Sequence, residues 1–227
     1  VRYSIENPQT YIDNNISGFL NVLQVCKQNK ISKLLYASSS SIYGSNDKFP
    51  FLESDKTDNP LSIYGVTKKT NELMAYSYQN LYKINAVGLR FFTVYGPWGR
   101  PDMSLYKFCN SIIANKSIDV YNFGKHARSF TYVEDIVNSL DLLIKKMLIS
   151  KLEQSIFNIG GSETISLMDY IGFIEKHLNK KAKINFMPLQ DGDVEKTESS
   201  TDLLKNEIGY MPKVSINEGI KYFVNWY

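Results

Sequence analysis

KLLYASSSSIYG, residues 33–44, decides the fold of this chain. It opens with a short apolar run between polar residues, which is typical of a buried β-strand. One helical pattern precedes it at about residues 9–29, a second follows at 62–82, and NAVGLRFF (85–92) is the next strand. Helix, strand, helix, strand predicts a doubly wound α/β fold, a parallel sheet covered by helices on both faces.

After Gly96-Pro97 the elements become shorter. Strands are predicted at 117–121 and 156–159, and helices at about 102–115, 133–148, 167–178 and 216–227. The sequence contains no repeat, no low-complexity stretch and no linker. The second half therefore indicates a smaller α/β lobe attached to the sheet.

Composition excludes several classes of protein. The formal charge of +3, from 26 basic and 23 acidic residues, is too small to indicate a nucleic-acid partner. No apolar run reaches the length of about 18 residues that a membrane helix needs, so no membrane partner is predicted. Two cysteines and two histidines offer no metal-ligand spacing, and no metal site is predicted. We expect a cytoplasmic protein that works with an organic cofactor.

Tyr64 and Lys68 are the strongest local indication of chemistry. Side chains four residues apart on a helix lie one turn apart on the same face, so the ammonium can approach the phenol. A free tyrosine has a pKa of about 10, and a nearby cation favours the phenolate, which can act as a base. The same spacing also arises by chance on amphipathic helices, so it needs support from the rest of the chain.

Serines 38–41 provide that support. They follow the strand at its carboxyl end, where open α/β sheets bind ligands. Ser39 precedes Tyr64 by 25 residues, enough for one loop before the helix. A hydroxyl at this place can share a hydrogen bond with the substrate oxygen that a tyrosine deprotonates. Taken alone, a serine run is more often a solvated loop.

With these residues assembled, the chain resembles the extended short-chain dehydrogenases/reductases, in particular the NAD-dependent nucleotide-sugar epimerases and dehydratases of the UDP-glucuronate 4-epimerase branch. The resemblance covers the whole chain. Its motifs are YASSSSIYG (36–44), SIYGVTKKTNELMA (62–75), LRFFTVYGPWGRPDMSLYKF (89–108), SIDVYNFGKHARSFTYVEDI (117–136), FNIGGSETISLMDYI (157–171), PLQDGDV (188–194) and FVNWY (223–227).

The resemblance implies a role for individual residues. Tyr64 would be the base and Ser39 its partner, while Lys68 would favour the phenolate and hold the nicotinamide ribose. Asn15 and Ser38 would lie on the cofactor side, although a helix hydrogen bond explains Asn15 equally well. The substrate-binding residues it implies are Ser39, Ser40, Ser41, Thr93, Arg100, Arg128, Gln190 and Asp193. For the two arginines the alternative is a surface salt bridge. The phosphate-binding role of Gln190 has the least support from the resemblance, because many relatives have arginine at this position.

The family's glycine-rich GxxGxxG turn is absent from these residues. We therefore expect an incomplete Rossmann-like sheet, with residues 1–97 as the later part of the NAD-binding domain. Residues 98–227 would be mainly the nucleotide-sugar-binding lobe, with about 130–160 returning to the sheet. The chain would be a fragment of a longer enzyme, bind NAD poorly and be inactive alone, with an unpaired sheet edge and an apolar face exposed.

The activity that the resemblance implies is NAD-dependent 4-epimerisation of UDP-glucuronate to UDP-galacturonate through a 4-keto sugar. One alternative is a UDP-glucuronate decarboxylase or another UDP-sugar 4-epimerase. Another is a nucleotide-sugar-binding remnant without catalysis. The two long helices resemble those that form a dimer interface in relatives, which implies a homodimer.

Overall fold

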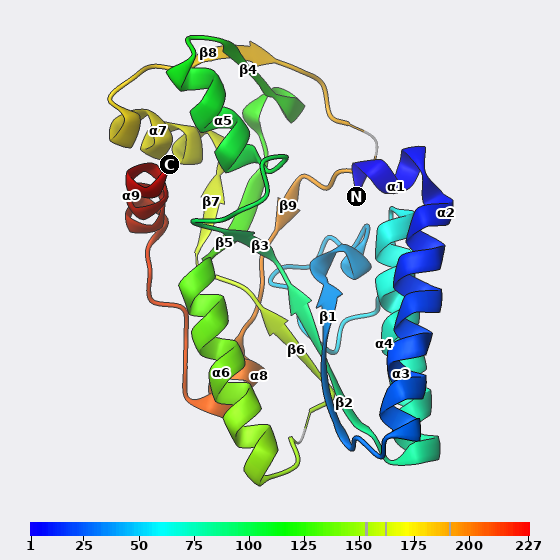
Figure 1. Ribbon diagram of the computed structural model, residues 1–227. Helices are drawn as coiled ribbons and strands as arrows, with labels where there is room; N and C mark the ends of the chain where they lie inside the picture. The colour runs from blue at the N-terminus through cyan, green and yellow to red at the C-terminus, as the bar shows by residue number, and fades with distance from the viewer. Residues whose placement is uncertain (153, 162, 191) are drawn as a thin grey trace.

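A three-stranded parallel sheet forms the lower half of the computed structural model, which describes residues 1–152, 154–161, 163–190 and 192–227 (Figure 1). The strand order is β1-β2-β6, with bounds Lys33–Ser39, Asn85–Phe91 and Ile156–Ile159. Helices flank this sheet, so the predicted Rossmann-like α/β class is confirmed. We call these strands, together with α3 (Gly18–Gln28), α4 (Ile63–Tyr82) and α6 (Val133–Ile149), the sheet region.

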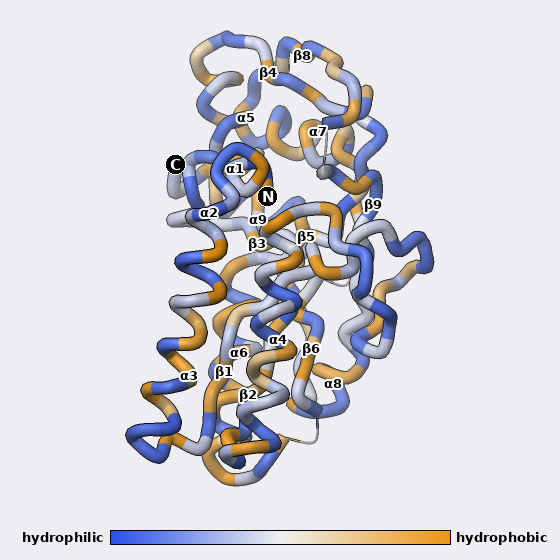
Figure 2. The backbone as a smooth tube through the Cα atoms, turned by 90° about the vertical axis from the view of Figure 1, so that its right-hand side faces the viewer, coloured by the Kyte–Doolittle hydropathy of each residue, from blue (hydrophilic) through white to orange (hydrophobic). Residues whose placement is uncertain are grey.

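Both faces of the sheet are apolar, and different helices cover them. On one face, Val87 and Phe157 pack with Leu143 of α6 (Val133–Ile149). On the other, Tyr36 and Ala86 join a cluster that includes residues of α3 (Gly18–Gln28) and α4 (Ile63–Tyr82). Apolar side chains on both faces are what a buried parallel sheet requires. Figure 2 shows α3 alternating between hydrophilic and hydrophobic residues, as a helix with one covered face does.

The long N-terminal helix is less regular than its pattern predicts. It consists of α2 (Pro8–Tyr11), a π-helical turn (Ile12–Ser17) and α3, and it follows the short helix α1 (Arg2–Glu6). Hydrophobic period alone does not distinguish an α-helix from one with an inserted π turn. By contrast, α4 begins as expected, because the hydroxyl of Ser62 accepts a hydrogen bond from Gly65 N at 3.1 Å.

The upper half, which we call the upper region, is built from short strands and helices (Figure 1). An aromatic core holds it together, with Phe130 and Tyr170 stacked at 4.3 Å between ring centres. Its elements are β3 (Thr93–Tyr95), α5 (Ser104–Ile113), β4 (Ser117–Val120), a 3-10 turn (Tyr121–Gly124), β5 (Ala127–Tyr132), β7 (Thr164–Ser166), α7 (Leu167–Leu178), β8 (Lys183–Phe186), β9 (Lys196–Thr197) and α9 (Ile216–Trp226).

Several elements have no counterpart in the sequence-based expectation. These are α1, β3, β5, β7, β8, β9 and α8 (Asp202–Ile208). All of them are only two to seven residues long, so each has too few residues to establish a period. The division of the chain at residue 97 stays a prediction, although β6, from the later half, does pair with β2. Among the described residues, no helix has both the length and the apolarity that a bilayer crossing requires.

Candidate active site

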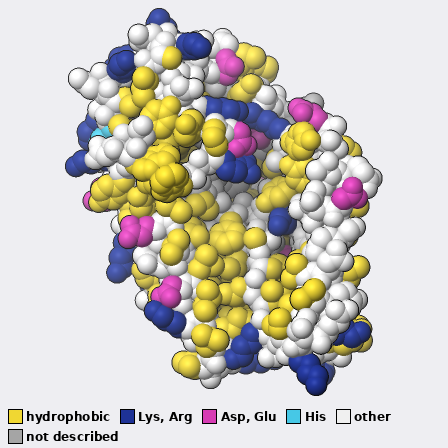
Figure 3. Space-filling model, in the orientation of Figure 1, with side chains coloured by type: hydrophobic (Ala, Val, Ile, Leu, Met, Phe, Trp, Pro, Cys, Tyr) yellow, Lys and Arg dark blue, Asp and Glu magenta, His cyan; other side chains and the backbone are white. Residues whose placement is uncertain are grey.

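A large cleft opens between the sheet region and the upper region. The space-filling view shows this face hollowed in its upper half, with lysine and arginine side chains gathered at the hollow (Figure 3). Its walls come from α1, the first turns of α4, the β2–β3 junction, α5, β5, the 192–194 loop and the segment after β1, which includes the 3-10 turn Ser40–Tyr43. We call residues Ser39–Tyr43 the serine loop. The cleft therefore lies beyond the carboxyl ends of the parallel strands, where open α/β sheets bind ligands.

Tyr64 and Lys68 both line the cleft from the start of α4. The ammonium nitrogen of Lys68 is 6.0 Å from the centre of the Tyr64 ring and donates a hydrogen bond to the carbonyl of Ala37 at 2.9 Å. Burial lowers the pKa of Lys68. The backbone N–H of Tyr64 donates to the hydroxyl of Ser4 at 3.3 Å. The predicted pair is thus together, with its cation anchored on β1.

The serine loop approaches this pair closely. Ser39, Ser40 and Ser41 line the cleft, and Ser39 accepts a hydrogen bond from the backbone of Ser41 at 3.1 Å. Helix α4 approaches the loop closely at Gly65, where a Cβ would lie 2.7 Å from the carbonyl oxygen of Ser41. A larger residue there would force the helix and the loop apart.

Ser38 is placed differently from its neighbours. It is 2% exposed and does not line the cleft, because its hydroxyl points into the protein and donates to Glu72 at 2.6 Å. Successive side chains of a strand face opposite sides, so the Ser38 hydroxyl is directed at Glu72 of α4 while Ser39 faces the other way. The cofactor-side role that the resemblance gives to Ser38 therefore has no geometric support.

Asn15 lies in the π-helical turn and lines the cleft. Its side-chain amide donates to the hydroxyl of Thr67 at 3.0 Å, and its backbone carbonyl accepts from the side-chain amide of Asn71 at 2.7 Å. The two hydrogen bonds join the π turn to α4 on either side of Lys68. Asn15 thus connects helices, and it also stands at the cleft.

The two predicted arginines have contrasting environments. Arg100 lines the cleft but is largely exposed, and it pairs with the exposed Asp102 at 2.9 Å. Arg128 extends from β5 into the cleft wall, where the carbonyls of Val194 and Glu195 accept its N–H groups. Burial lowers the pKa of Arg128, and the carboxylate of Asp193 opposes that shift. Arg128 is thus held in place by backbone, whereas Arg100 stands in solvent.

Of the remaining predicted residues, Thr93 and Asp193 line the cleft and Gln190 does not. Asp193 pairs with Arg2 of α1 at 3.4 Å, and this pair joins the 192–194 loop to α1. The side-chain oxygen of Gln190 is buried without a hydrogen-bond partner among the described residues.

Sequence reasoning missed several lining residues. Arg2 lies over the ring of Tyr121 at 5.0 Å, and both line the cleft together with Tyr11, Trp98 and His126. Burial lowers the pKa of His126, and the neighbouring Arg128 adds to the effect. No local spacing marks these residues as a group, because only the fold brings the N-terminal helices, Trp98 and the 121–126 segment to one cleft.

A parallel sheet with such a cleft at its strand ends, lined by serine, tyrosine and lysine, is the architecture of the extended short-chain dehydrogenases/reductases. The model of the NAD dependent epimerase/dehydratase family matches residues 1–160, more than half of the chain, and the chain belongs to this family. It is an NAD-dependent nucleotide-sugar epimerase.

The similarity extends along the whole chain. It is 51% identical to the uncharacterized protein MJ1055 of Methanocaldococcus jannaschii, covering 100% of this chain and 68% of that protein. It is 43% identical to a probable UDP-glucuronate 4-epimerase of Rhizobium meliloti, covering 100% of this chain and 71% of the relative. The UDP-glucuronic acid 4-epimerase of Bacillus cereus, solved with UDP-glucuronic acid and NAD, superposes with a TM-score of 0.89 at 31% identity, over 95% of this chain and 68% of that one.

The residues present fit the nicotinamide end of NAD. The Lys68 ammonium stands at the cleft with a carbonyl acceptor behind it, and an ammonium has three N–H groups, so two stay available for ribose hydroxyls. Tyr64 lies beside it. No GxxGxxG turn occurs in the sequence, so the described residues offer no glycine cradle for the pyrophosphate.

Proposed function

We propose that the reaction is the 4-epimerisation of UDP-glucuronate to UDP-galacturonate. One observation carries this proposal: the cleft is lined by Ser39, Tyr64 and Lys68 and also by Arg100 and Arg128. The first three residues supply acid–base chemistry on a sugar hydroxyl, and the guanidinium groups match a carboxylate and a diphosphate. The Rhizobium meliloti relative, a probable UDP-glucuronate 4-epimerase, and the Bacillus cereus structure support the same substrate.

Each residue has a defined task in this proposal. Tyr64, as phenolate, accepts the proton of the C4 hydroxyl, and Ser39 donates a hydrogen bond to the same oxygen. Lys68 places its positive charge beside the base, 6.0 Å from the centre of the Tyr64 ring. When bound, NAD supplies a reversible hydride acceptor, so the reaction is redox-neutral overall. After the 4-keto sugar has turned about its diphosphate, Tyr64 returns the proton to the C4 oxygen.

Arg100 and Arg128 hold the two ends of the substrate. Arg128, fixed by the carbonyls of the 194–195 segment, contacts the diphosphate, while Asp193 and Gln190 belong to the loop that closes on the nucleotide. Arg100 contacts the glucuronate carboxylate, together with Thr93, Ser40 and Ser41. Because a 4-keto glucuronate is a β-keto acid that loses CO₂ easily, these groups must keep the carboxylate out of the alignment that decarboxylation needs.

The chain alone is proposed to bind the nucleotide sugar but not to turn it over, because the glycine cradle for NAD is absent from the sequence. Calorimetry on residues 1–227 tests this. UDP-glucuronate should bind more tightly than UDP-glucose, and NAD should bind weakly or not at all. Tight NAD binding with turnover would overturn the proposed inactivity, and equal affinity for the two sugars would count against glucuronate.

Turnover needs a form of the protein with a complete cofactor site, and a chimera provides one. In this chimera, residues 1–227 replace the matching region of the Rhizobium meliloti relative. We expect it to convert UDP-glucuronate to UDP-galacturonate, resolved by anion-exchange chromatography. Pentose products would instead identify a decarboxylase, and turnover of neutral sugars alone would identify a different UDP-sugar epimerase. The Tyr64→Phe chimera is the control that removes the base.

A second candidate, a nucleotide-sugar-binding protein without catalysis, rests on one observation: residues 1–227 contain no glycine-rich turn. A chimera that binds UDP-glucuronate and NAD but never forms product would support it over the epimerase.

The proposal also includes a cytoplasmic homodimer. Its support is an exposed apolar stripe on the two long helices: Val22 and Val25 on α3, and Val66, Leu73 and Tyr76 on α4. Such a stripe is typical of a helix that packs against a partner. Sedimentation equilibrium tests it, with Leu73→Glu/Tyr76→Glu expected to give a monomer.

A further inference from the structure

Three buried polar side chains form one row across the carboxyl end of the parallel sheet. The register pairs Ser38 of β1 with Arg90 of β2, and Arg90 with Asn158 of β6. Their exposed fractions are 2%, 4% and 0%. Arginine is among the residues least often buried, so an arginine inside a central strand needs matched partners.

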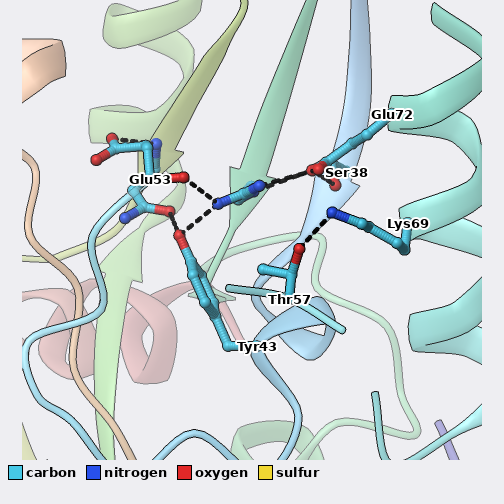
Figure 4. A network of polar contacts seen from close by, with 8 residues as sticks. Ser38, Tyr43, Glu53, Thr57, Lys69 and Glu72 are labelled. Carbon is cyan, nitrogen blue, oxygen red and sulfur yellow. Dashed lines mark hydrogen bonds and ion pairs between the residues drawn. The ribbon is translucent and has the colours of Figure 1, made fainter. Parts of the chain in front are cut away.

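Glu72 of α4 provides the matching charge (Figure 4). Its carboxylate accepts two hydrogen bonds from Arg90, at 3.0 Å from Nε and 2.9 Å from Nη2, and one from the hydroxyl of Ser38 at 2.6 Å. Burial alone would lower the pKa of Arg90, but the hydrogen bonds and charge of Glu72 raise it. The guanidinium and carboxylate form a bidentate pair that fixes both position and orientation.

The network holds the serine loop on both sides. Ser38, just before Ser39, is tied to Glu72, and Tyr43, at the end of the loop, is tied to Arg90. The Tyr43 hydroxyl accepts from Arg90 at 2.9 Å and donates to Asn158 at 2.7 Å. Burial raises the pKa of Tyr43 to about 12, so this hydroxyl stays protonated and keeps both roles.

The same network holds α4. Lys68 and Glu72 are one turn apart on one face of the helix, and they contact consecutive residues of β1: Lys68 the carbonyl of Ala37, and Glu72 the hydroxyl of Ser38. Helix α4 therefore cannot rotate or slide along β1 without breaking one of these contacts. Tyr64 lies one turn before Lys68 and shares this constraint.

We propose that Glu72 and Arg90 are positioning residues that hold the serine loop and the Tyr64–Lys68 turn in reacting register. Replacing a buried ion pair by apolar residues is often neutral or stabilising, so stability alone does not account for one in this place. The inference rests on the proposed function only for its effect on turnover. Its structural part, the placement of Tyr64, can be measured without catalysis.

The test uses residues 1–227 labelled with 3-fluorotyrosine. The ¹⁹F resonance of Tyr64, one of 16 tyrosines, is the one that Tyr64→Phe removes. Glu72→Gln and Ser38→Ala should each shift or broaden it. Asp135→Asn is the matched control, because it also removes a buried carboxylate charge, one that binds Tyr210, Lys213 and Val214 in another part of the fold. It should leave the Tyr64 resonance where it is.

In the chimera, Glu72→Gln should lower kcat by about 100-fold, the effect of a misplacement of roughly 1 Å, with a much smaller change in KM. Glu72→Asp keeps the charge but has a shorter side chain, and it should recover little of the lost kcat.

An unmoved Tyr64 resonance in folded Glu72→Gln or Ser38→Ala overturns the proposal, and so does an equal shift in Asp135→Asn. Should Glu72→Gln not fold, Ser38→Ala decides alone. A wild-type chimera without turnover on any UDP-sugar would refute the proposed function, while the resonance would still test the positioning.

Discussion

The two walls of the cleft hold their functional side chains in different ways. In the sheet region, Tyr64 and Lys68 sit on a helix that the buried Arg90–Glu72 pair fixes to the strands. In the upper region, Arg128 is held by carbonyls of a loop, and Arg100 stands exposed beside Asp102. The wall in the sheet region is fixed by a buried ion pair between side chains. In the upper region one arginine is held by backbone carbonyls, and the other is exposed.

This difference matches the division between chemistry and binding. Proton transfer requires placement to a fraction of an ångström, which rigid elements provide. Recognition of a diphosphate or carboxylate tolerates more movement, because charge acts over longer distances. Substitutions in the sheet region should therefore affect turnover, and substitutions in the upper region should affect affinity.

The largest effect is expected for Tyr64→Phe. Removing the phenolic oxygen while keeping the ring should lower kcat in the chimera by about 10²–10⁴-fold, the usual contribution of a general base. Affinity for UDP, measured by calorimetry, should stay unchanged because Tyr64 belongs to the sheet wall. A comparable loss of UDP affinity would contradict the division between the two walls.

Breaking the buried ion pair should have the next largest effect, on stability. Arg90→Met leaves Glu72 buried without its cation, and the free energy of unfolding should fall by about 3–5 kcal/mol. Urea denaturation of residues 1–227 measures it. Arg100→Met removes an equally charged side chain from an exposed pair and should cost less than about 1 kcal/mol. Equal losses would show that Arg90 is no better matched than a surface arginine.

The third effect separates the two arginines of the upper region. Arg128→Gln should weaken UDP binding by about 10- to 100-fold, as expected for lost hydrogen bonds to a charged group. Arg100→Gln should leave UDP binding unchanged and remove the preference for UDP-glucuronate over UDP-glucose. Calorimetry with the three ligands distinguishes the two results. A loss of UDP affinity in Arg100→Gln would indicate that the diphosphate binds Arg100, and it would contradict the assignment of the diphosphate to Arg128.

The sequence predicted those parts of the molecule that depend on local pattern. The strand at Lys33, the helix from Ile63 and the helix at Leu167–Leu178 lie within one residue of their expected ends, because apolar period and a capping hydroxyl mark them. The π-helical turn at Ile12–Ser17 keeps an apolar face and so escaped detection.

The candidate site divides in the same way. Tyr64 and Lys68 share one helix face, so their spacing alone predicts their proximity. Arg90 and Glu72 are 18 residues apart on different elements, and their pairing depends on how α4 packs against the sheet. The carbonyls that hold Arg128 come from 66 and 67 residues away. No sequence pattern specifies contacts of this kind, since the fold as a whole creates them.

The smallest effect concerns Lys68 and pH. Burial lowers the pKa of Lys68 in the folded chain, whereas an unfolded lysine titrates at about 10.4. Between these two values the unfolded state binds more protons than the folded state, so this group adds stability as pH rises through that window. At lower pH the folded chain carries the cost of a buried charge. Urea denaturation at increasing alkaline pH should therefore show wild type gaining stability relative to Lys68→Met. Lys83→Met removes an exposed lysine at the far end of α4, and wild type should gain no stability relative to this variant as pH rises. If wild type gained equally relative to both variants, burial of Lys68 would be refuted as the cause.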